Sequence, residues 1–572
     1  MNNAMEILTE PDVRVPMRDG VRMAAHVFRP DAAGRFPGIL LRTPYGRPKS
    51  GFERYVRAGY AVVSMDSRGR YGSEGDWIPF TEAHTGDAED GYDSVEWLAA
   101  QPWCNGRVGT LGASYNAWMQ WQLAKLRPPH LLAMCAYTIP LELTEVDWPG
   151  GFRPGRRIKW WLTSMAPDLR RRQGLPPPHT PSEALEEWNE DVEKQWLDYL
   201  PWLDFPRHLP PGLAEYARDW LAHPNRRAWR FDEVHGEVAV PNLDFSGWYD
   251  HCNGSMWHLQ LMQRNGRTAQ ARSQTKLIAG PWNHPSLGSR QVAGFDFGSD
   301  AEVDLPGMII RWFDYWLKED DNGIDDEPAV RYFAMAGKGG YWREADTWPP
   351  PNTTPRAYLL SSDGNAGFGG SGRLSVDGGN DGVDRFEYDP HDPVPTLWTK
   401  QLFTGPSDRR LLEDRDDILC YRSAPLTEAV EIAGYPEAVL FVSSSAPDTD
   451  FFARLVDEYP STDGDQAPAL EMCYGMVCAR HRNGLDSEEL LELGTVVELR
   501  IQLGPTACRF EPGHRIRLEI TSSDFPNHDR NHNTGRNDLA DTKLVRATNA
   551  VHHSAAHPSR LVLPTISHPT AD

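Results

Sequence analysis

Hydrophobic positions in the first quarter of the chain alternate between a two-residue and a helical period. Asp12 to Pro30 alternates apolar and polar residues around a tight turn, which predicts a β-hairpin. The apolar runs Phe36 to Leu41 and Tyr60 to Met65 predict strands, and the second is continuous enough to be buried on both faces of a parallel sheet. Helical spacing follows at Phe52 to Ala58 and Asp87 to Gln101. Strands and helices in this rhythm predict a doubly wound α/β sheet.

The rhythm breaks after a strand expected at Leu131 to Ile139. Residues 145–235 are rich in tryptophan, proline and charge, and their helical patterns lie at Pro181 to Tyr199 and Gly212 to Ala222. We interpret this stretch as a helical cap inserted over the sheet. The sheet pattern then resumes and closes with a helix, in elements expected at Val238 to Phe245, Thr275 to Ile278 and Leu305 to Leu317.

From about Pro328 the chain consists of short β-rich segments separated by Gly, Pro, Asp and Asn. Their spacing predicts an antiparallel sandwich, a jelly roll. The segments are Ala329 to Ala334, Ala357 to Leu360, Ala429 to Ile432, Ala438 to Ser443, Phe451 to Val456, Val496 to Leu503 and Arg515 to Ile520. We therefore expect a doubly wound α/β domain (residues 1–144 and 236–327), a helical cap (145–235) and a C-terminal all-β jelly roll (328–572).

A strand, a turn of small residues and a helix meet at Gly112-Ala113-Ser114-Tyr115. This is the layout of a nucleophile elbow, in which strand and helix nearly touch and the central residue is held in a strained conformation. Ser114 is therefore the candidate nucleophile. Asn116, followed by Ala117, stands where the usual G-x-S-x-G pattern has its second glycine. The alternative interpretation is a β-α turn whose serine only caps the helix.

A serine nucleophile needs a base and a carboxylate that orients the base. In an α/β-hydrolase sheet the nucleophile, acid and base follow in that order, each at the carboxyl end of a strand. Asp250 and His284 follow the two late strands, which makes them the candidate acid and base. His251 is a competing histidine, expected to point the other way from Asp250, and Asp244 is expected to be structural.

The oxyanion of an acyl-transfer reaction needs hydrogen-bond donors. The backbone N–H of Tyr115, directly after the nucleophile, is one candidate. The phenol of Tyr45, which follows an early strand, is the other, although a tyrosine at such a place more often serves packing.

The composition of the chain argues against some classes of binding partner. A net charge of -23 without a basic run argues against nucleic acid and anionic membranes as partners. The longest apolar run is too short to span a bilayer, and no signal-like start is present, so we expect a cytoplasmic protein. Seven scattered cysteines indicate reduced thiols and no zinc site, and no cofactor is expected. The sequence leaves open whether the protein forms a homo-oligomer.

Several short motifs together resemble the CocE/NonD hydrolases, a family that is similar in plan to X-Pro dipeptidyl-peptidases and includes cocaine esterase, α-amino acid ester hydrolases and glutaryl acylases. The motifs are Val15 to Val21, Arg42-Thr43-Pro44-Tyr45, Asp66 to Gly69 with Ser73-Glu74-Gly75, Gly112 to Tyr115, Gly247-Trp248-Tyr249-Asp250 and Gly280-Pro281-Trp282-Asn283-His284. Segments of the β-rich part, including Asp414 to Leu426, look like the family's jelly roll. The resemblance implies a Ser114–His284–Asp250 triad with Tyr45 and the Tyr115 amide as the oxyanion hole.

We accordingly expect a serine hydrolase that cleaves a small-molecule ester or activated amide through an acyl-enzyme, without a metal. Tryptophans beside the acid and base and in the cap are candidates for lining an apolar acyl pocket. They are Trp248 and Trp282 beside the triad and, in the cap, Trp148 and Trp161 together with Trp160, Trp188, Trp196 and Trp202. The acidic segment 186–191 suggests, by analogy with the α-amino acid ester hydrolases, a site for a substrate ammonium group. The alternatives are an X-Pro dipeptidyl-peptidase and a non-catalytic carbohydrate-binding protein with a degenerate hydrolase domain.

Overall fold

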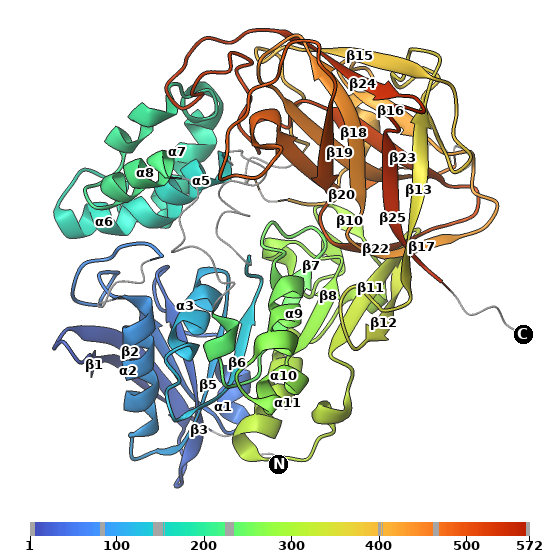
Figure 1. The fold of residues 1–572 in the computed structure, drawn as a ribbon. Coiled ribbons are helices and arrows are strands. Elements are labelled where there is room, and N and C mark those ends of the chain that lie inside the picture. Colours follow the sequence, from blue (N-terminus) through green and yellow to red (C-terminus); the bar gives the residue numbers. More distant parts are fainter. Residues whose placement is uncertain are drawn as a thin grey trace, which may run out of the picture.

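The computed structural model describes residues 6–80, 86–140, 153, 155–223, 234–397, 402, 404–460 and 468–567. Three parts are seen in Figure 1: an α/β part with a central sheet, a group of helices beside it, and a large β part. Within the described residues no helix is both long and apolar enough to cross a membrane. No disulfide joins any of the seven cysteines, all of which are buried.

The central sheet begins with the predicted hairpin and then becomes parallel. Its strand order is β1-β2-β4-β3-β5-β6, with β1, β2 and β4 antiparallel to one another and β4, β3, β5 and β6 parallel. The strands are β1 (Ile7–Pro16), β2 (Arg22–Pro30), β3 (Phe36–Thr43), β4 (Ala61–Asp66), β5 (Cys104–Ala113) and β6 (Leu131–Tyr137).

Two further strands, β7 (Leu243–Gly247) and β8 (Lys276–Gly280), continue this sheet. The backbone N–H of Thr138, just beyond β6, donates to Phe245 of β7 at 3.0 Å, and β7 pairs with β8 in parallel. The carboxyl ends of β5, β7 and β8 therefore lie at one edge of the sheet. Sequence reasoning started β7 too early, at Val238.

The strand β11 (Val330–Ala336) lies at the predicted domain boundary. We expected it to open the sandwich, and the structure shows that it also pairs in parallel with β8 and so extends the central sheet. Near its end it also pairs with β22 of the β part, through Met335 and Cys508. The two parts thus share a strand, and their separation at residue 328 is not sharp.

Helices cover both faces of the parallel strands. They are α1 (Glu53–Arg57), α2 (Asp87–Ala99), α3 (Tyr115–Ala124), α9 (Ser255–Asn265), α10 (Ala269–Gln274) and α11 (Leu305–Lys318). Successive strand residues point to opposite faces. Ile39 accordingly packs in the core that holds Phe313 of α11, whereas Leu40 packs in the core that holds Leu98 of α2. The rhythm predicted from the sequence is therefore correct, although α9 was not foreseen.

Residues 155–223 form the group of helices beside the sheet (Figure 1). They comprise α5 (Gly155–Lys159), a π-helix (Trp160–Met165), α6 (Ala166–Gln173), α7 (Pro181–Asp191), a second π-helix (Val192–Trp196), a 3-10 helix (Trp202–His208) and α8 (Leu213–Ala222). A capping box of Thr180 and Glu183 fixes the start of α7. The predicted helices at 181–199 and 212–222 are present, but the helical run from 155 to 173 was missed.

The C-terminal β part consists mainly of antiparallel pairs, as expected from its spacing of turns. Its strands are β12 (Gly339–Ala345), β13 (Thr353–Ser361), β14 (Arg373–Ser375), β15 (Gly382–Tyr388), β16 (Leu419–Arg422), β17 (Val430–Gly434), β18 (Glu437–Ser444), β19 (Asp450–Glu458), β20 (Ala469–Cys478), β21 (Val497–Gln502), β22 (Thr506–Phe510), β23 (Arg515–Thr521), β24 (Ala547–His553) and β25 (Arg560–Ile566).

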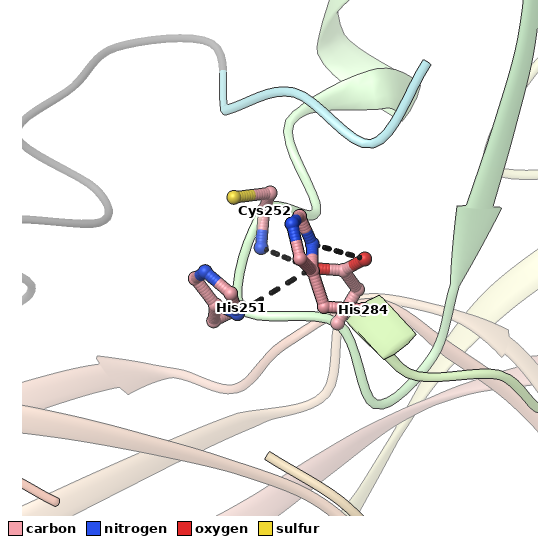
Figure 2. A group of neighbouring side chains, drawn as sticks. His251, Cys252 and His284 are labelled. Atoms are coloured by element: carbon pink, nitrogen blue, oxygen red, sulfur yellow. Dashed lines mark hydrogen bonds and ion pairs between the residues drawn. The ribbon is translucent and has the colours of Figure 1, made fainter. Parts of the chain in front are cut away.

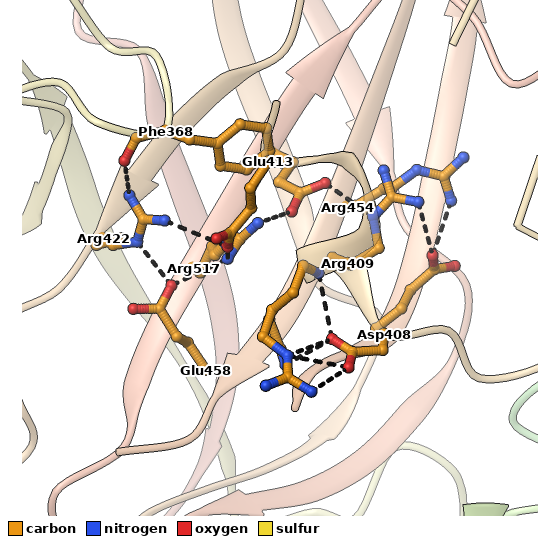
Figure 3. Close-up of polar contacts among 12 residues, drawn as sticks. Phe368, Asp408, Arg409, Glu413, Arg422, Arg454, Glu458 and Arg517 are labelled. Atoms are coloured by element: carbon orange, nitrogen blue, oxygen red, sulfur yellow. Dashed lines mark hydrogen bonds and ion pairs between the residues drawn. The ribbon is translucent and has the colours of Figure 1, made fainter. Parts of the chain in front are cut away.

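A network of buried ion pairs crosses the strands β19, β20 and β23 (Figure 3). Arg517 is fully buried and contacts Glu519 at 2.6 Å, Glu413 at 2.7 Å and Glu458 at 3.1 Å. Arg409 donates to the other oxygen of Glu519 at 2.9 Å. Burial alone would raise the pKa of Glu519, but the neighbouring arginines outweigh it and the net shift is downward. The charges are thus mutually compensated.

Candidate active site

Ser114 occupies the turn between β5 and α3 with φ 58° and ψ -124°, a conformation that a serine adopts only under constraint. Its backbone N–H donates to the carbonyl of Tyr137 in β6 at 3.0 Å, and its carbonyl accepts from Ala117 and Trp118. Its side chain makes no capping hydrogen bond to the helix. A serine that merely capped the helix would have extended backbone angles and such a bond. The structure therefore favours the nucleophile elbow.

Asp250 and His284 meet at the same edge of the sheet. The Nδ1–H of His284 donates to both carboxylate oxygens of Asp250, at 3.0 and 3.1 Å (Figure 2). Asp250 is 2% exposed, and its Oδ1 also accepts from the backbone N–H of Cys252 at 2.7 Å. With Nδ1 held in this way, the opposite ring nitrogen of His284, Nε2, is the one left to act as a base.

The pKa of His284 results from two opposing effects. Burial lowers it, but the charge and the hydrogen bond of Asp250 raise it by more, so that the net shift is upward. A higher pKa makes His284 a stronger base for a serine proton.

Tyr45 lies just beyond the end of β3. Its hydroxyl oxygen accepts a hydrogen bond from Nε1 of Trp160 at 3.2 Å. Because an indole can only donate, the phenolic proton of Tyr45 is directed elsewhere and can be donated to a substrate. Burial raises the pKa of Tyr45, although 38% of the residue is exposed, so the phenol keeps this proton at neutral pH.

Tyr115 is the first residue of α3, where backbone N–H groups have no partner within the helix. Its phenol is engaged elsewhere: it accepts from the N–H of Phe80 at 2.7 Å and lies 3.1 Å from Asp87 Oδ2. Of the two donors of Tyr115, only the amide is therefore suited to an oxyanion. Burial raises the pKa of Asp87 to about 7.

Ser114, Tyr45 and His284 line one cavity of about 290 Å³ between the sheet edge and the helical segment. Aromatic side chains form one wall, in which Phe80 stacks on Tyr115 with ring centroids 4.2 Å apart. The described lining residues are Tyr45, Phe80, Ser114, Tyr115, Trp118, Ile139, Pro140, Arg156, Arg157, Lys159, Trp160, Thr163, Ser164, His251, Cys252 and His284.

Known proteins resemble this chain over nearly its whole length. A cocaine esterase from Rhodococcus sp. (strain MB1 Bresler) is 35% identical over 587 aligned residues, which cover 97% of this chain and 98% of that protein. The chain belongs to the CocE/NonD family of serine hydrolases. The X-Pro dipeptidyl-peptidase (S15 family) model matches residues 19–286, and the model of the X-Pro dipeptidyl-peptidase C-terminal non-catalytic domain matches residues 322–562. The CocE/NonD assignment predicted from the motifs is thus confirmed.

Other relatives support the same family. A putative serine esterase of Mycobacterium bovis is 28% identical, over 96% of this chain and 94% of that protein. An α-amino acid ester hydrolase has the same fold, with a TM-score of 0.80 at 22% identity, covering 99% of this chain and 97% of that one. A CocE/NonD family hydrolase from Staphylococcus aureus gives a TM-score of 0.67 at 19% identity, with coverages of 98% and 94%. This CocE/NonD chain is therefore a serine hydrolase of the carboxylic ester class.

Three of the tryptophans predicted to line the CocE/NonD acyl pocket, Trp161, Trp248 and Trp282, are not among the described lining residues. Trp248 donates from Nε1 to the carbonyl of Phe333 at 2.8 Å, and Trp282 donates to the carbonyl of Ala301 at 3.0 Å. Both are core residues, and their hydrogen bonds stabilise the loops that carry Asp250 and His284. Trp161 is fully buried against Phe205 and Trp220, and Trp148 lies outside the described residues.

Sequence reasoning included Trp160 among the candidate cap tryptophans, but it missed two further aromatic residues that line the cavity, Phe80 and Trp118. Trp118 lies one turn beyond Ser114 on α3, a spacing from which it could have been found. Trp160 and Trp161 were both candidates, but only Trp160 is among the lining residues. Adjacent residues of a helix point in different directions, so one faces the cavity while its neighbour packs in the core.

The ionisable groups brought to the cavity by the helical segment are basic. Arg157 lies over the ring of Trp160 at 4.7 Å, and burial lowers the pKa of Arg156, of Arg157 and, to about 8, of Lys159. By contrast, Glu186, Glu187, Glu190 and Asp191 are exposed on α7. The acidic segment is thus a solvated helix face, and none of its carboxylates is among the described lining residues of the cavity at Ser114.

His251 lies closer to the triad than the sequence suggested. Its Nδ1 is 3.6 Å from Asp250 Oδ1, and its ring centroid is 4.7 Å from that of His284 (Figure 2). Burial, helped by Arg156 and His284, lowers the pKa of His251 far below its usual value. The longer distance to Asp250 makes His284 the better candidate base. Asp244 is buried and accepts from Ser255 at 2.9 Å, in line with its expected structural role.

Proposed function

We propose that this serine hydrolase cleaves small-molecule carboxylic esters through an acyl-enzyme on Ser114, with His284 as general base and Asp250 as its orienting carboxylate. The observation that carries the proposal is that a serine in a strained elbow and a histidine held by a buried aspartate line one cavity. This arrangement has the roles of a hydrolase triad.

In the first half-reaction Nε2 of His284 takes the hydroxyl proton of Ser114 as the oxygen attacks the ester carbonyl. The negative charge that develops on the carbonyl oxygen is stabilised by the phenol of Tyr45 and the amide of Tyr115. Collapse of this intermediate expels the alcohol, which receives its proton from His284. Water then attacks the acyl-enzyme with His284 again as base, releasing the acid and restoring Ser114.

In this proposal the helical segment acts as a cap and the β part is a jelly roll. The cap contributes Trp160 and Arg157 to the cavity, so it determines which acyl groups fit. Tyr249, next to Asp250, donates from its hydroxyl to the carbonyl of Glu471 in the β part at 2.9 Å. The β part thereby supports the loop that carries the catalytic acid.

The X-Pro dipeptidyl-peptidase alternative requires acidic groups that grip the free N-terminus of a peptide. Among the described lining residues, the side chains that carry a charge at neutral pH are the basic groups of Arg156, Arg157 and Lys159. This favours an ester over a peptide with a free ammonium group. The carbohydrate-binding alternative is disfavoured because competent residues occupy each proposed catalytic position.

The test is hydrolysis of a p-nitrophenyl ester series, from acetyl through butyryl to benzoyl, by wild type and Ser114→Ala, with Ala-Pro-anilide as the peptidase substrate. We expect ester turnover that falls by about 10⁶-fold in the variant. A fluorophosphonate should label Ser114, as located by mass spectrometry. Faster cleavage of Ala-Pro-anilide than of every ester would favour the peptidase, and a folded wild type without turnover or label would refute the proposal.

A further inference from the structure

Four side chains with metal-ligating atoms gather where β7 and β8 end: Asp250, His251, Cys252 and His284. One ligand atom from each, a carboxylate oxygen, two imidazole nitrogens and a thiol sulfur, lies within 4.8 Å of all the others. Figure 2 shows His251, Cys252 and His284 close together. Sequence spacing did not reveal this group, because it joins a run of three consecutive residues to a histidine on another loop.

We propose that these four residues bind a Zn²⁺ ion, and that the bound ion switches the esterase off. The donor set of two nitrogens, one sulfur and one oxygen is one that Zn²⁺ accepts in proteins and that Mg²⁺ and Ca²⁺ do not favour. The site is distinct from a catalytic zinc centre, since the proposed ester chemistry proceeds without the ion.

The distances require only a small contraction. Zn–N and Zn–S bonds of about 2.0–2.3 Å in a tetrahedron separate the ligand atoms by roughly 3.3–3.8 Å. Asp250 Oδ1 already lies 3.0 Å from His284 Nδ1 and 3.6 Å from His251 Nδ1. The other pairs of ligand atoms lie up to 4.8 Å apart, and rotations about the side-chain bonds of His251 and Cys252 bring them closer.

The cavity gives a metal ion access to this site, and the backbone holds one of the ligands in place. His251, Cys252 and His284 all line the 290 Å³ cavity, so an ion can enter by the route the substrate takes. Asp250 is fixed by the N–H of Cys252 at 2.7 Å and is nearly inaccessible. Zn²⁺ binding displaces one proton from the thiol of Cys252 to solvent, forms the Zn–S bond and leaves every oxidation state unchanged.

Zinc binding and ester hydrolysis exclude each other whichever nitrogen of His284 takes part. Coordination through Nε2 occupies the lone pair that accepts the serine proton. Coordination through Nδ1 requires the ring proton to move to Nε2, where it blocks the lone pair that accepts the serine proton, and it replaces the hydrogen bond to Asp250 that holds the imidazole in position. The inhibitory half of the proposal rests on the proposed function, whereas the binding half does not.

Binding is tested on the full chain by calorimetric titration with ZnCl₂ and by the absorption spectrum after addition of Co²⁺. We expect one equivalent of Zn²⁺ to bind to wild type and to Ser114→Ala alike, and Co²⁺ to give a thiolate charge-transfer band in the near ultraviolet. Because Ser114→Ala has no turnover to lose, this result is independent of the esterase activity. Absence of stoichiometric binding in both proteins would overturn the proposal.

The variants Cys252→Ser and His251→Asn test the ligands, and circular dichroism checks that each is folded. Loss of one ligand should weaken Zn²⁺ binding by at least about 100-fold, more than the 10- to 100-fold typical of outer-shell groups. His130→Gln is the matched control, since His130 is a surface histidine paired with Glu96. Unchanged affinity in both ligand variants, or a loss only in His130→Gln, would place the ion elsewhere and refute the site.

Inhibition is measured as the Zn²⁺ concentration that halves p-nitrophenyl ester hydrolysis, relative to each protein's own rate without metal. This concentration should match the calorimetric dissociation constant and rise about 100-fold in Cys252→Ser. Addition of EDTA should restore the activity. Zinc binding without inhibition would refute the switch. Inhibition equally strong in wild type and Cys252→Ser would show that the ion acts at another place.

Discussion

A Cβ atom on Gly112 would lie 2.6 Å from the Cβ of Asn116. Gly112 has a φ of +151°, and it faces the first turn of α3 from the end of β5. The elbow therefore tolerates an asparagine at the position where its usual pattern has glycine, because the residue opposite has no side chain. The departure at Asn116 is accommodated within the turn.

Gly112→Ala should therefore disturb the elbow. The close contact forces β5 and α3 apart, at a cost of about 1–3 kcal/mol in unfolding free energy, and moves Ser114 away from His284. We expect kcat/KM for p-nitrophenyl butyrate to fall strongly. Thermal unfolding and ester kinetics measure the two effects.

Two further variants separate the contact from backbone strain. Gly59→Ala has a similarly unfavourable φ of +92° but meets no atom within 4 Å, so it should lose stability without losing activity. The double variant Gly112→Ala/Asn116→Gly removes the contact and should recover part of the rate. If the double variant were no better than Gly112→Ala, the contact would not be the cause.

The pH dependence of hydrolysis should report His284. The base must be neutral to accept a proton, so activity falls as the pH drops through the pKa of His284. Asp250 holds that pKa up against the effect of burial. In Asp250→Asn only burial and the charge of Arg156 act on the pKa of His284, and both lower it. The acid limb of kcat/KM should therefore move to lower pH. The plateau should fall by about 10⁴-fold. An acid limb that stays in place would mean that another group titrates.

Tyr45→Phe removes one proposed oxyanion donor. Loss of such a donor lowers kcat by about 10²- to 10³-fold with little change in KM. Tyr115→Phe is the matched comparison, because its phenol is engaged with Phe80 and Asp87 and its backbone amide remains. We expect a much smaller effect on kcat there. Equal losses in the two variants would argue that Tyr45 only packs against its neighbours.

The acyl preference should depend on charge. Arg156, Arg157 and Lys159 line the cavity, so a carboxylate on the acyl group should be attracted and an ammonium group repelled. We expect kcat/KM to be higher for a p-nitrophenyl hemiester of a dicarboxylic acid than for an α-amino acyl ester, and added salt to reduce the difference.

The variant Arg157→Met should lower the ratio of these two kcat/KM values. Arg171→Met is its control, since Arg171 is half exposed on α6 and pairs with Asp168 outside the cavity lining. An unchanged ratio in Arg157→Met, or the same change in both variants, would contradict the charge preference.

Much of the catalytic sheet and its site is determined by the sequence alone. The apolar run before Ser114, the small residues around it and the order of serine, aspartate and histidine are local signals, because each depends on a few neighbouring residues and on where a strand ends. Tyr45 was found in the same way. These residues lie together in the structure because the carboxyl ends of parallel strands share one edge of a sheet.

Only the tertiary structure decided which side chains form the cavity. Which of Trp160 and Trp161 faces the cavity depends on how the π-helix packs against α6 and α7, and the choice of Trp118 over Trp248 depends on packing between residues far apart in sequence. The pairing of β11 with β8 and the gathering of His251 and Cys252 beside His284 are contacts of the same kind. Such contacts arise when separate elements bury their apolar faces together, so no local pattern encodes them.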